Sequence, residues 1–168
     1  TIDDFPYGPA NVVSVADAMF AVSRLRACLD AQQNVTQPRL SVDLEGPRLG
    51  GNGHICYIQV QADSCGSSAP TCNYVFDVFG CGSFLLGTSG TDSQPTLRDL
   101  LEDASVVKLF HCCYGDTAAL FNGYGIRCFP VFDTSVADAI ALGVAHNKQR
   151  GLLTVLHEWL GSRVAEFT

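Results

Sequence analysis

Residues 39–45 constrain the fold more than any other segment, because apolar and polar residues alternate strictly along them. The apolar side chains fall at every second position: Leu40, Val42 and Leu44. The polar groups that face the other way are Ser41, Asp43 and Glu45. Since successive side chains of a strand point to opposite faces, the pattern predicts a β-strand with one buried face and one polar face.

The order of the remaining elements predicts the fold class. Two further β-rich runs, residues 54–62 and 73–79, follow the first strand and predict an antiparallel meander. A helix over residues 16–29 precedes it. After it, helical and strand patterns alternate: helices over 97–103, 116–124, 135–142 and 151–160, and strands over 106–112 and 129–132. We therefore expect an α/β fold, a mixed sheet of three antiparallel strands and then parallel strands, flanked by helices.

The length of 168 residues suits one domain with a substantial core. Residues 1–10 lack periodicity and contain two prolines, so they predict an extended N-terminal arm before a domain over residues 11–168. The longest apolar runs, such as residues 139–145, are far shorter than a membrane span, and no signal peptide opens the chain. We expect a soluble intracellular protein without a membrane partner.

The net charge of −7 limits how the chain can bind nucleic acid. A domain that binds nucleic acid by phosphate contacts alone is normally basic. If this chain acts on nucleic acid, bound cations or a partner must offset the repulsion.

The eight cysteines show no C-x-x-C pair, which disfavours a zinc site. Cys56, Cys112 and Cys113 lie in or beside apolar runs, so we expect them to be buried, reduced and free of metal. Cys65 and Cys72 flank a Ser-rich loop, and their pairing under oxidation is the alternative.

Three carboxylates are candidates for chemistry. Asp43 and Glu45 form a D-x-E pair on one strand face, about 6 to 7 Å apart at their Cα atoms. Such a pair is suited to bind Mg²⁺ or Mn²⁺. Alternatively, the two carboxylates simply form the solvated face of an edge strand. Asp116 lies in the first turn of a helix that follows a buried strand, and α/β sheets place ligands at such positions. The alternative role for Asp116 is helix capping.

Several ordered motifs resemble one family. They are SVDLEG, NYVFDVFG, VVKLFHCCYGDTAAL, FPVFDTSVADAI and RGLLTVLHEWLG. Together they resemble the ribonuclease-D-like branch of the DEDD 3′–5′ exonucleases, which includes Egalitarian-type domains and has a ribonuclease H-like fold. The resemblance implies that Asp43, Glu45 and Asp116 are catalytic and ligate two Mg²⁺ or Mn²⁺ ions. It also implies hydrolysis of nucleic acid, with RNA favoured, from the 3′ end.

The same resemblance gives other residues lesser roles. Asp133 and Thr134 match a stretch that is structural in the family. His111 either shapes the site and contacts the substrate or packs at the strand end. Tyr114, like Phe110 and Tyr124, either stacks on a base or packs in the core.

One family motif is not found in residues 1–168: a Tyr or His four residues before an Asp, after HEWLG. We therefore expect either that the domain over 11–168 is C-terminally incomplete or that catalysis has been lost. The alternatives are an inactive module of this fold that binds RNA or a protein partner, and a scaffold subunit of a larger assembly. A thiol redox enzyme using Cys112 and Cys113 is disfavoured, because the pair ends a buried strand.

Overall fold

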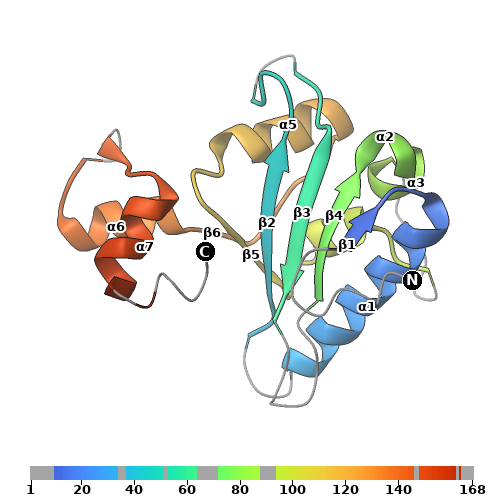
Figure 1. Cartoon of the computed structure of the whole chain (residues 1–168), viewed down its shortest axis with the longest axis horizontal. Helices are drawn as coiled ribbons and strands as arrows, with labels where there is room; N and C mark the ends of the chain where they lie inside the picture. The colour runs from blue at the N-terminus through green and yellow to red at the C-terminus, as the bar shows by residue number, and fades with distance from the viewer. Residues whose placement is uncertain are drawn as a thin grey trace.

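The computed structural model describes residues 10–33, 37–50, 53–63, 72–87, 94–145, 148–161 and 163. Their strands form one six-stranded sheet in the order β1-β4-β3-β2-β5-β6 (Figure 1). The strands are β1 (Ala10–Val12), β2 (Arg39–Glu45), β3 (Tyr57–Ala62), β4 (Cys72–Asp77), β5 (Val107–Phe110) and β6 (Val131–Asp133). The helices are α1 (Val15–Gln33), α2 (Val78–Cys81), α3 (Ser83–Leu86), α4 (Leu97–Glu102), α5 (Tyr114–Tyr124), α6 (Thr134–Leu142) and α7 (Leu152–Leu160).

The pairing confirms the predicted mixed sheet. β2, β3 and β4 form the antiparallel meander, and β5 lies parallel to β2 with Ser41 opposite Leu109. β6 continues the parallel part beside β5. Strand β1 was not predicted: Ala10, which we assigned to the arm, begins a short strand parallel to β4. The rest of the predicted arm, residues 1–9, lies outside the described residues.

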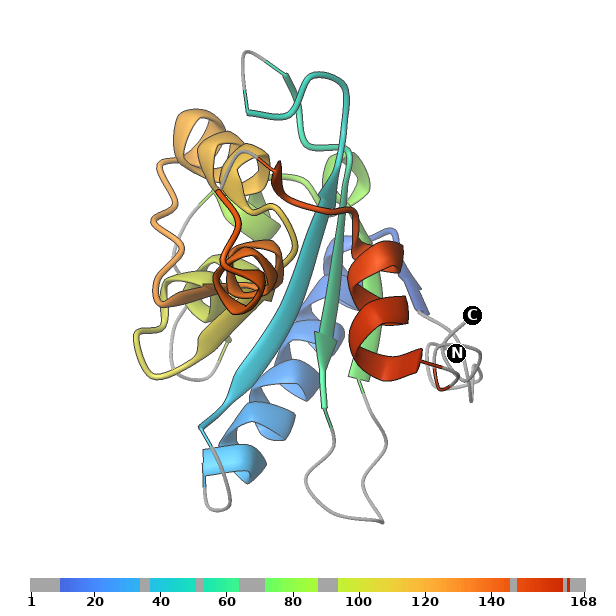
Figure 2. The same ribbon diagram turned by 90° about the vertical axis from the view of Figure 1, so that its left-hand side faces the viewer.

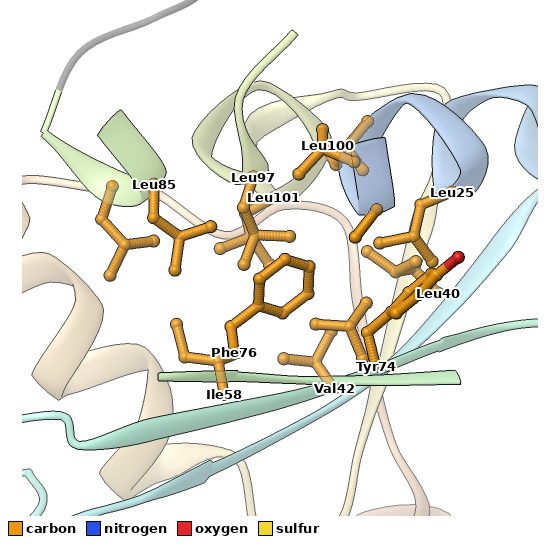
Figure 3. Close-up of a cluster of buried hydrophobic side chains, with 14 of the residues drawn as sticks. Leu25, Leu40, Val42, Ile58, Tyr74, Phe76, Leu85, Leu97, Leu100 and Leu101 are labelled. Carbon is orange, nitrogen blue, oxygen red and sulfur yellow. The ribbon is translucent and has the colours of Figure 1, made fainter. Parts of the chain in front are cut away.

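The hydrophobic core lies on one face of the sheet. β2 buries every second residue, in agreement with its sequence alternation, and leaves Asp43 and Glu45 on the opposite face. Figure 3 shows Val42, Ile58 and Phe76 of the meander pointing toward leucines of α1, α3 and α4. Because the two faces of β2 are so different, a register shift of one residue would bury its carboxylates, so the register is strongly specified.

Several element boundaries differ from the predicted ones for local reasons. β4 ends at Asp77 because its carboxylate accepts hydrogen bonds from the amides of Phe79 and Gly80 and caps α2. β5 ends at Phe110, and two residues later the backbone of Cys112 turns with a φ of 63°. Helix α3 was not predicted, since it lies in a stretch rich in Gly and Ser.

The predicted burial of three cysteines is wrong. Cys112 is exposed, and Cys56 and Cys113 are partly exposed. Cys112 and Cys113 lie beyond the end of β5 and Cys56 lies before the start of β3, so none of them occupies an inward strand position. Cys65, in the alternative disulfide, lies outside the described residues.

Helices α6 and α7 are joined by one cluster of polar side chains. The buried carboxylate of Asp138 accepts two hydrogen bonds from Arg150, at 2.9 and 2.6 Å, and one from Trp159 Nε1 at 2.7 Å. In Figure 2, α7 and α5 lie on opposite sides of the sheet. Among the helices of the described segments, none has the length and apolar character that crossing a membrane requires.

Candidate active site

The polar face of β2 presents Asp43 and Glu45 side by side toward its carboxyl end. Both are exposed and alternate with buried Val42 and Leu44. In the antiparallel register Asp43 lies opposite Gln59, and Glu45 lies opposite Tyr57. Gln59 Nε2 donates a hydrogen bond of 3.4 Å to Asp43 Oδ2. The neighbouring strand thus helps to orient one carboxylate of the pair.

Asp116 comes to the same edge of the sheet through β5 and α5. Because β5 runs parallel to β2, the helix that follows β5 begins beside the carboxyl end of β2. Asp116 lies in the first turn of α5 and is only 8% exposed. The turn after β2 packs directly on this helix start: a Cβ on Gly50 would lie 3.1 Å from Gly115 Cα. Gly50 also has a φ of +85°, so glycine is required there for two reasons.

The three carboxylates interact electrostatically. Burial first, and then the negative charges of Asp43, Glu45 and Asp133, together raise the pKa of Asp116 to about 7. Partial burial of its carboxyl and the charge of Glu45 likewise raise the pKa of Asp43, while a backbone hydrogen bond from Leu44 and the nearby His111 oppose this rise. Like charges that raise one another's pKa lie near one another, and a bound cation would relieve their repulsion.

The donor set fits a hard divalent cation in its chemistry. Carboxylate oxygens are the ligands that Mg²⁺ and Mn²⁺ prefer. In the part of the chain that the structure describes, however, no three His, Cys, Asp or Glu side chains are arranged closely enough to enclose one ion. The convergence of Asp43, Glu45 and Asp116 on a metal therefore stays a prediction.

His111 connects the site to the C-terminal helices. Its Nδ1 lies 2.8 Å from Thr134 Oγ1, and its Nε2 lies 2.9 Å from the carbonyl oxygen of Arg150. The Thr134 hydroxyl is also within 3.0 Å of the Phe110 carbonyl. These contacts join the end of β5, the start of α6 and the segment that leads into α7, so His111 holds one wall of the site in place.

The aromatic candidates divide by exposure. Tyr114 is 84% exposed at the start of α5, two residues before Asp116, which excludes core packing for it. Phe110 is buried, and Tyr124 packs against the core. Both residues therefore have the core-packing role that was the alternative to base stacking. Tyr57 is a second exposed aromatic that we did not predict, opposite Glu45 on the adjoining strand.

A cleft of about 520 Å³ adjoins Asp43 on the polar face of the sheet. Its polar lining comes from the strands and the segment after β5: Ser41, Asp43, Gln59, Gln61, Asn73, His111 and Thr134. Its apolar lining includes Leu109, Phe110 and Leu152, the last from the start of α7. Sequence reasoning missed Gln59 and Gln61, although alternation along residues 57–62 places them on the face of Asp43.

The raised pKa of Asp116 predicts a pH-dependent stability in EDTA. An unfolded Asp has a pKa near 4, so between pH ~4 and ~7 the folded state holds a proton that the unfolded state has lost. The stability from this proton is complete below pH ~4 and is lost as the pH rises through about 7. Between pH 4.5 and 8, wild-type protein should lose about 2 to 4 kcal/mol more unfolding free energy than Asp116→Asn.

Urea unfolding of both proteins at a series of pH values measures this difference. Asp30→Asn, on the exposed side of α1, is the matched control and should keep the wild-type dependence on pH. Parallel curves for wild type and Asp116→Asn would contradict the electrostatic coupling at the site.

Comparison with known families identifies the class. Residues 20–168 match the family described as 3′-5′ exonuclease. The chain therefore belongs to the 3′-5′ exonuclease family, and the resemblance inferred from its motifs is confirmed.

Two curated relatives resemble parts of the chain. The human piRNA biogenesis protein EXD1 is 36% identical over 110 residues, which are 65% of this chain and 18% of that protein. Ribonuclease D of Sphingobium indicum is 34% identical over 82 residues, 47% of this chain and 20% of the relative. The alignments thus span a fifth or less of the length of these relatives.

Solved structures share the fold. Ribonuclease D of Trypanosoma brucei in complex with RNA U12 matches with a TM-score of 0.66 and 22% identity over 99% of this chain and 52% of that one. Brucella melitensis NrnC with bound Mg²⁺ matches with a TM-score of 0.52 and 22% identity, over 77% of this chain and 56% of that one. The likeness confirms the ribonuclease H-like sheet flanked by helices.

Proposed function

We propose that this domain is a metal-dependent 3′–5′ exonuclease that acts on single-stranded RNA. The main support for the proposal is the raised pKa of Asp116, which is caused by its burial and by the negative charges of Asp43 and Glu45 at the same edge of the sheet. Placing a buried carboxyl in the field of two other acidic groups costs stability, and a bound cation would offset that cost.

Asp43, Glu45 and Asp116 are the residues that would hold Mg²⁺ or Mn²⁺. Such ions, when bound as a pair, would supply an activated water and positive charge for the phosphate undergoing cleavage. A related fold, that of Brucella melitensis NrnC, has a solved structure with bound Mg²⁺, which supports the choice of cation. Gln59 orients Asp43 through its hydrogen bond, and His111 keeps the wall of the cleft in place.

The cleft beside Asp43 supports a nucleic-acid substrate. Its volume of about 520 Å³ lies within the range of small-molecule sites and suits a nucleotide. No Lys or Arg occurs among the described residues that line it, so Ser41, Gln61 and Asn73 offer neutral donors and acceptors. Such groups bind base edges and sugar hydroxyls, and exposed Tyr114 can stack on a base. RNA is favoured because the 2′-OH adds a partner for these amides.

The test is an assay of a single-stranded RNA labelled at its 5′ end, incubated with the full-length protein and Mn²⁺. We expect a ladder of products that shorten one nucleotide at a time from the 3′ end, and we expect EDTA to stop it. The same RNA with a blocked 3′ end should remain intact. Internal cleavage, or equal shortening in EDTA, would contradict the proposal.

A second candidate function is an inactive module that binds RNA or a protein partner. One observation favours it: among the described residues, no three His, Cys, Asp or Glu side chains lie close enough to enclose one ion. The assay separates the two functions. RNA that is bound but never shortened, with Mg²⁺ or Mn²⁺ present, would support the binding module and contradict the exonuclease.

A further inference from the structure

Two cysteines far apart in the sequence face each other outside the site. Cys28 lies on α1, and Cys72 is the first residue of β4. Their Sγ atoms are 3.0 Å apart, about 1 Å more than the length of a disulfide bond. Cys72 is buried, while Cys28 is partly exposed, so a small reagent can reach the pair from the side of Cys28.

We propose that Cys28 and Cys72 form a redox modification site, which a low-molecular-weight disulfide such as oxidised glutathione converts to an intramolecular disulfide. The Cys28 thiolate attacks one sulfur of the reagent, forms a mixed disulfide and releases one small thiol. The Cys72 thiolate then attacks Cys28 Sγ and releases the second small thiol. Two protein S–H bonds are lost and one S–S bond forms, while the reagent is reduced to two thiols.

The surroundings of the pair make this oxidation slow. Burial, with the neighbouring Cys72 thiol as a further cause, raises the pKa of Cys28 to about 12, and the nearby Arg24 charge opposes the rise. Since the thiolate is the attacking species, little of Cys28 is reactive near neutral pH. Cys112 is exposed, so glutathione can reach it directly and should form a mixed disulfide there first. It therefore reports that the reagent is active.

Disulfide formation would fasten the core helix to the meander. The two residues are 44 apart in the sequence, and the segment between them includes β2 and β3. A cross-link over a loop of this length restricts the unfolded chain, so the oxidised protein should have a Tm about 5 to 10 °C higher. The inference is independent of the proposed exonuclease function, because neither cysteine lines the cleft.

The test treats the full-length protein with oxidised glutathione at pH 8.5, quenches free thiols, and maps peptides by mass spectrometry without reduction. We expect a peptide pair joined through Cys28 and Cys72, a raised Tm, and reversal of both by dithiothreitol. Cys72→Ser and Cys28→Ser should each lose the Tm rise while Cys112 still reacts. Glutathione on Cys112 without any linked Cys28–Cys72 peptide, or with Cys72 linked to Cys65 instead, would overturn the proposal.

Discussion

Asp43→Asn should lower the rate of metal-dependent RNA shortening at least about a thousandfold. The substitution keeps the shape of the side chain and removes one charge from the cluster that would hold the metal. Metal charge contributes several kcal/mol to such reactions, and about 4 kcal/mol corresponds to a factor of about a thousand. The initial rate of shortening of 5′-labelled RNA in saturating Mn²⁺ measures the effect.

The fold should survive this change. Because partial burial and the charge of Glu45 raise the pKa of Asp43, removing its charge relieves both costs, and in EDTA the variant should be at least as stable as wild type. Asp30→Asn makes the same chemical change on the exposed side of α1 and should keep the wild-type rate. Asp43→Asn protein that retains a tenth or more of that rate would show that Asp43 does not carry the chemistry.

The largest effect on stability is expected from Asp133→Ala. The Asp133 carboxylate accepts hydrogen bonds from the amides of Cys112, Cys113 and Ser135, at 3.1, 2.9 and 2.8 Å, and from the Ser135 hydroxyl at 2.6 Å. It thus joins the turn after β5 to the start of α6. Removing it leaves several amides without their acceptor, so we expect a loss of about 3 kcal/mol in the free energy of unfolding.

Chemical denaturation at pH 7 measures this loss. Asp77→Ala is the matched control, because Asp77 also caps a helix but accepts two amide hydrogen bonds among the described residues, and it should cost about 1 kcal/mol. The turn that Asp133 orders leads into α5, so Asp133→Ala should also weaken activity by displacing Asp116. Equal losses for the two variants would contradict the special role of Asp133.

The contribution of Asp133 should also depend on pH. Burial alone would raise its pKa, but hydrogen bonds from Ser135, Cys113 and Cys112 outweigh this and hold the pKa well below its usual range. A carboxylate with a lowered folded-state pKa stabilises fully above pH ~4, and the benefit is lost as the pH falls further. This direction is opposite to that of Asp116.

Local sequence patterns predicted the parts of the fold that local physics determines. The alternation of residues 39–45 gave β2 with its bounds, because one face of that strand meets the core and the other does not. The short apolar run after α4 indicated a strand parallel to β2, and the pairing of β5 confirms it. The order of these elements was enough to place Asp116 at the start of a helix beside β2.

Features that depend on distant partners could not be predicted in this way. β1 has only three residues and exists through its pairing with β4, more than sixty positions later. The exposure of Cys112 depends on how the chain leaves β5 toward Asp133. The cleft exists because Leu152 of α7 lies against the polar face of the meander. The sequence around Gln59 and Gln61 contains no pattern that predicts this tertiary contact.

The central claim is that Asp43, Glu45 and Asp116 together bind a divalent cation, and the shift in Tm on adding Mn²⁺ tests it most directly. A ligand that binds only the folded state, at about a hundred times its Kd, adds about 2.7 kcal/mol of stability. For a chain of this size that corresponds to a rise of about 5 to 10 °C. We predict this rise for wild type and for Asp30→Asn, and no rise for Asp43→Asn or Asp116→Asn. An equal rise in all four proteins, or none in wild type, would contradict the account.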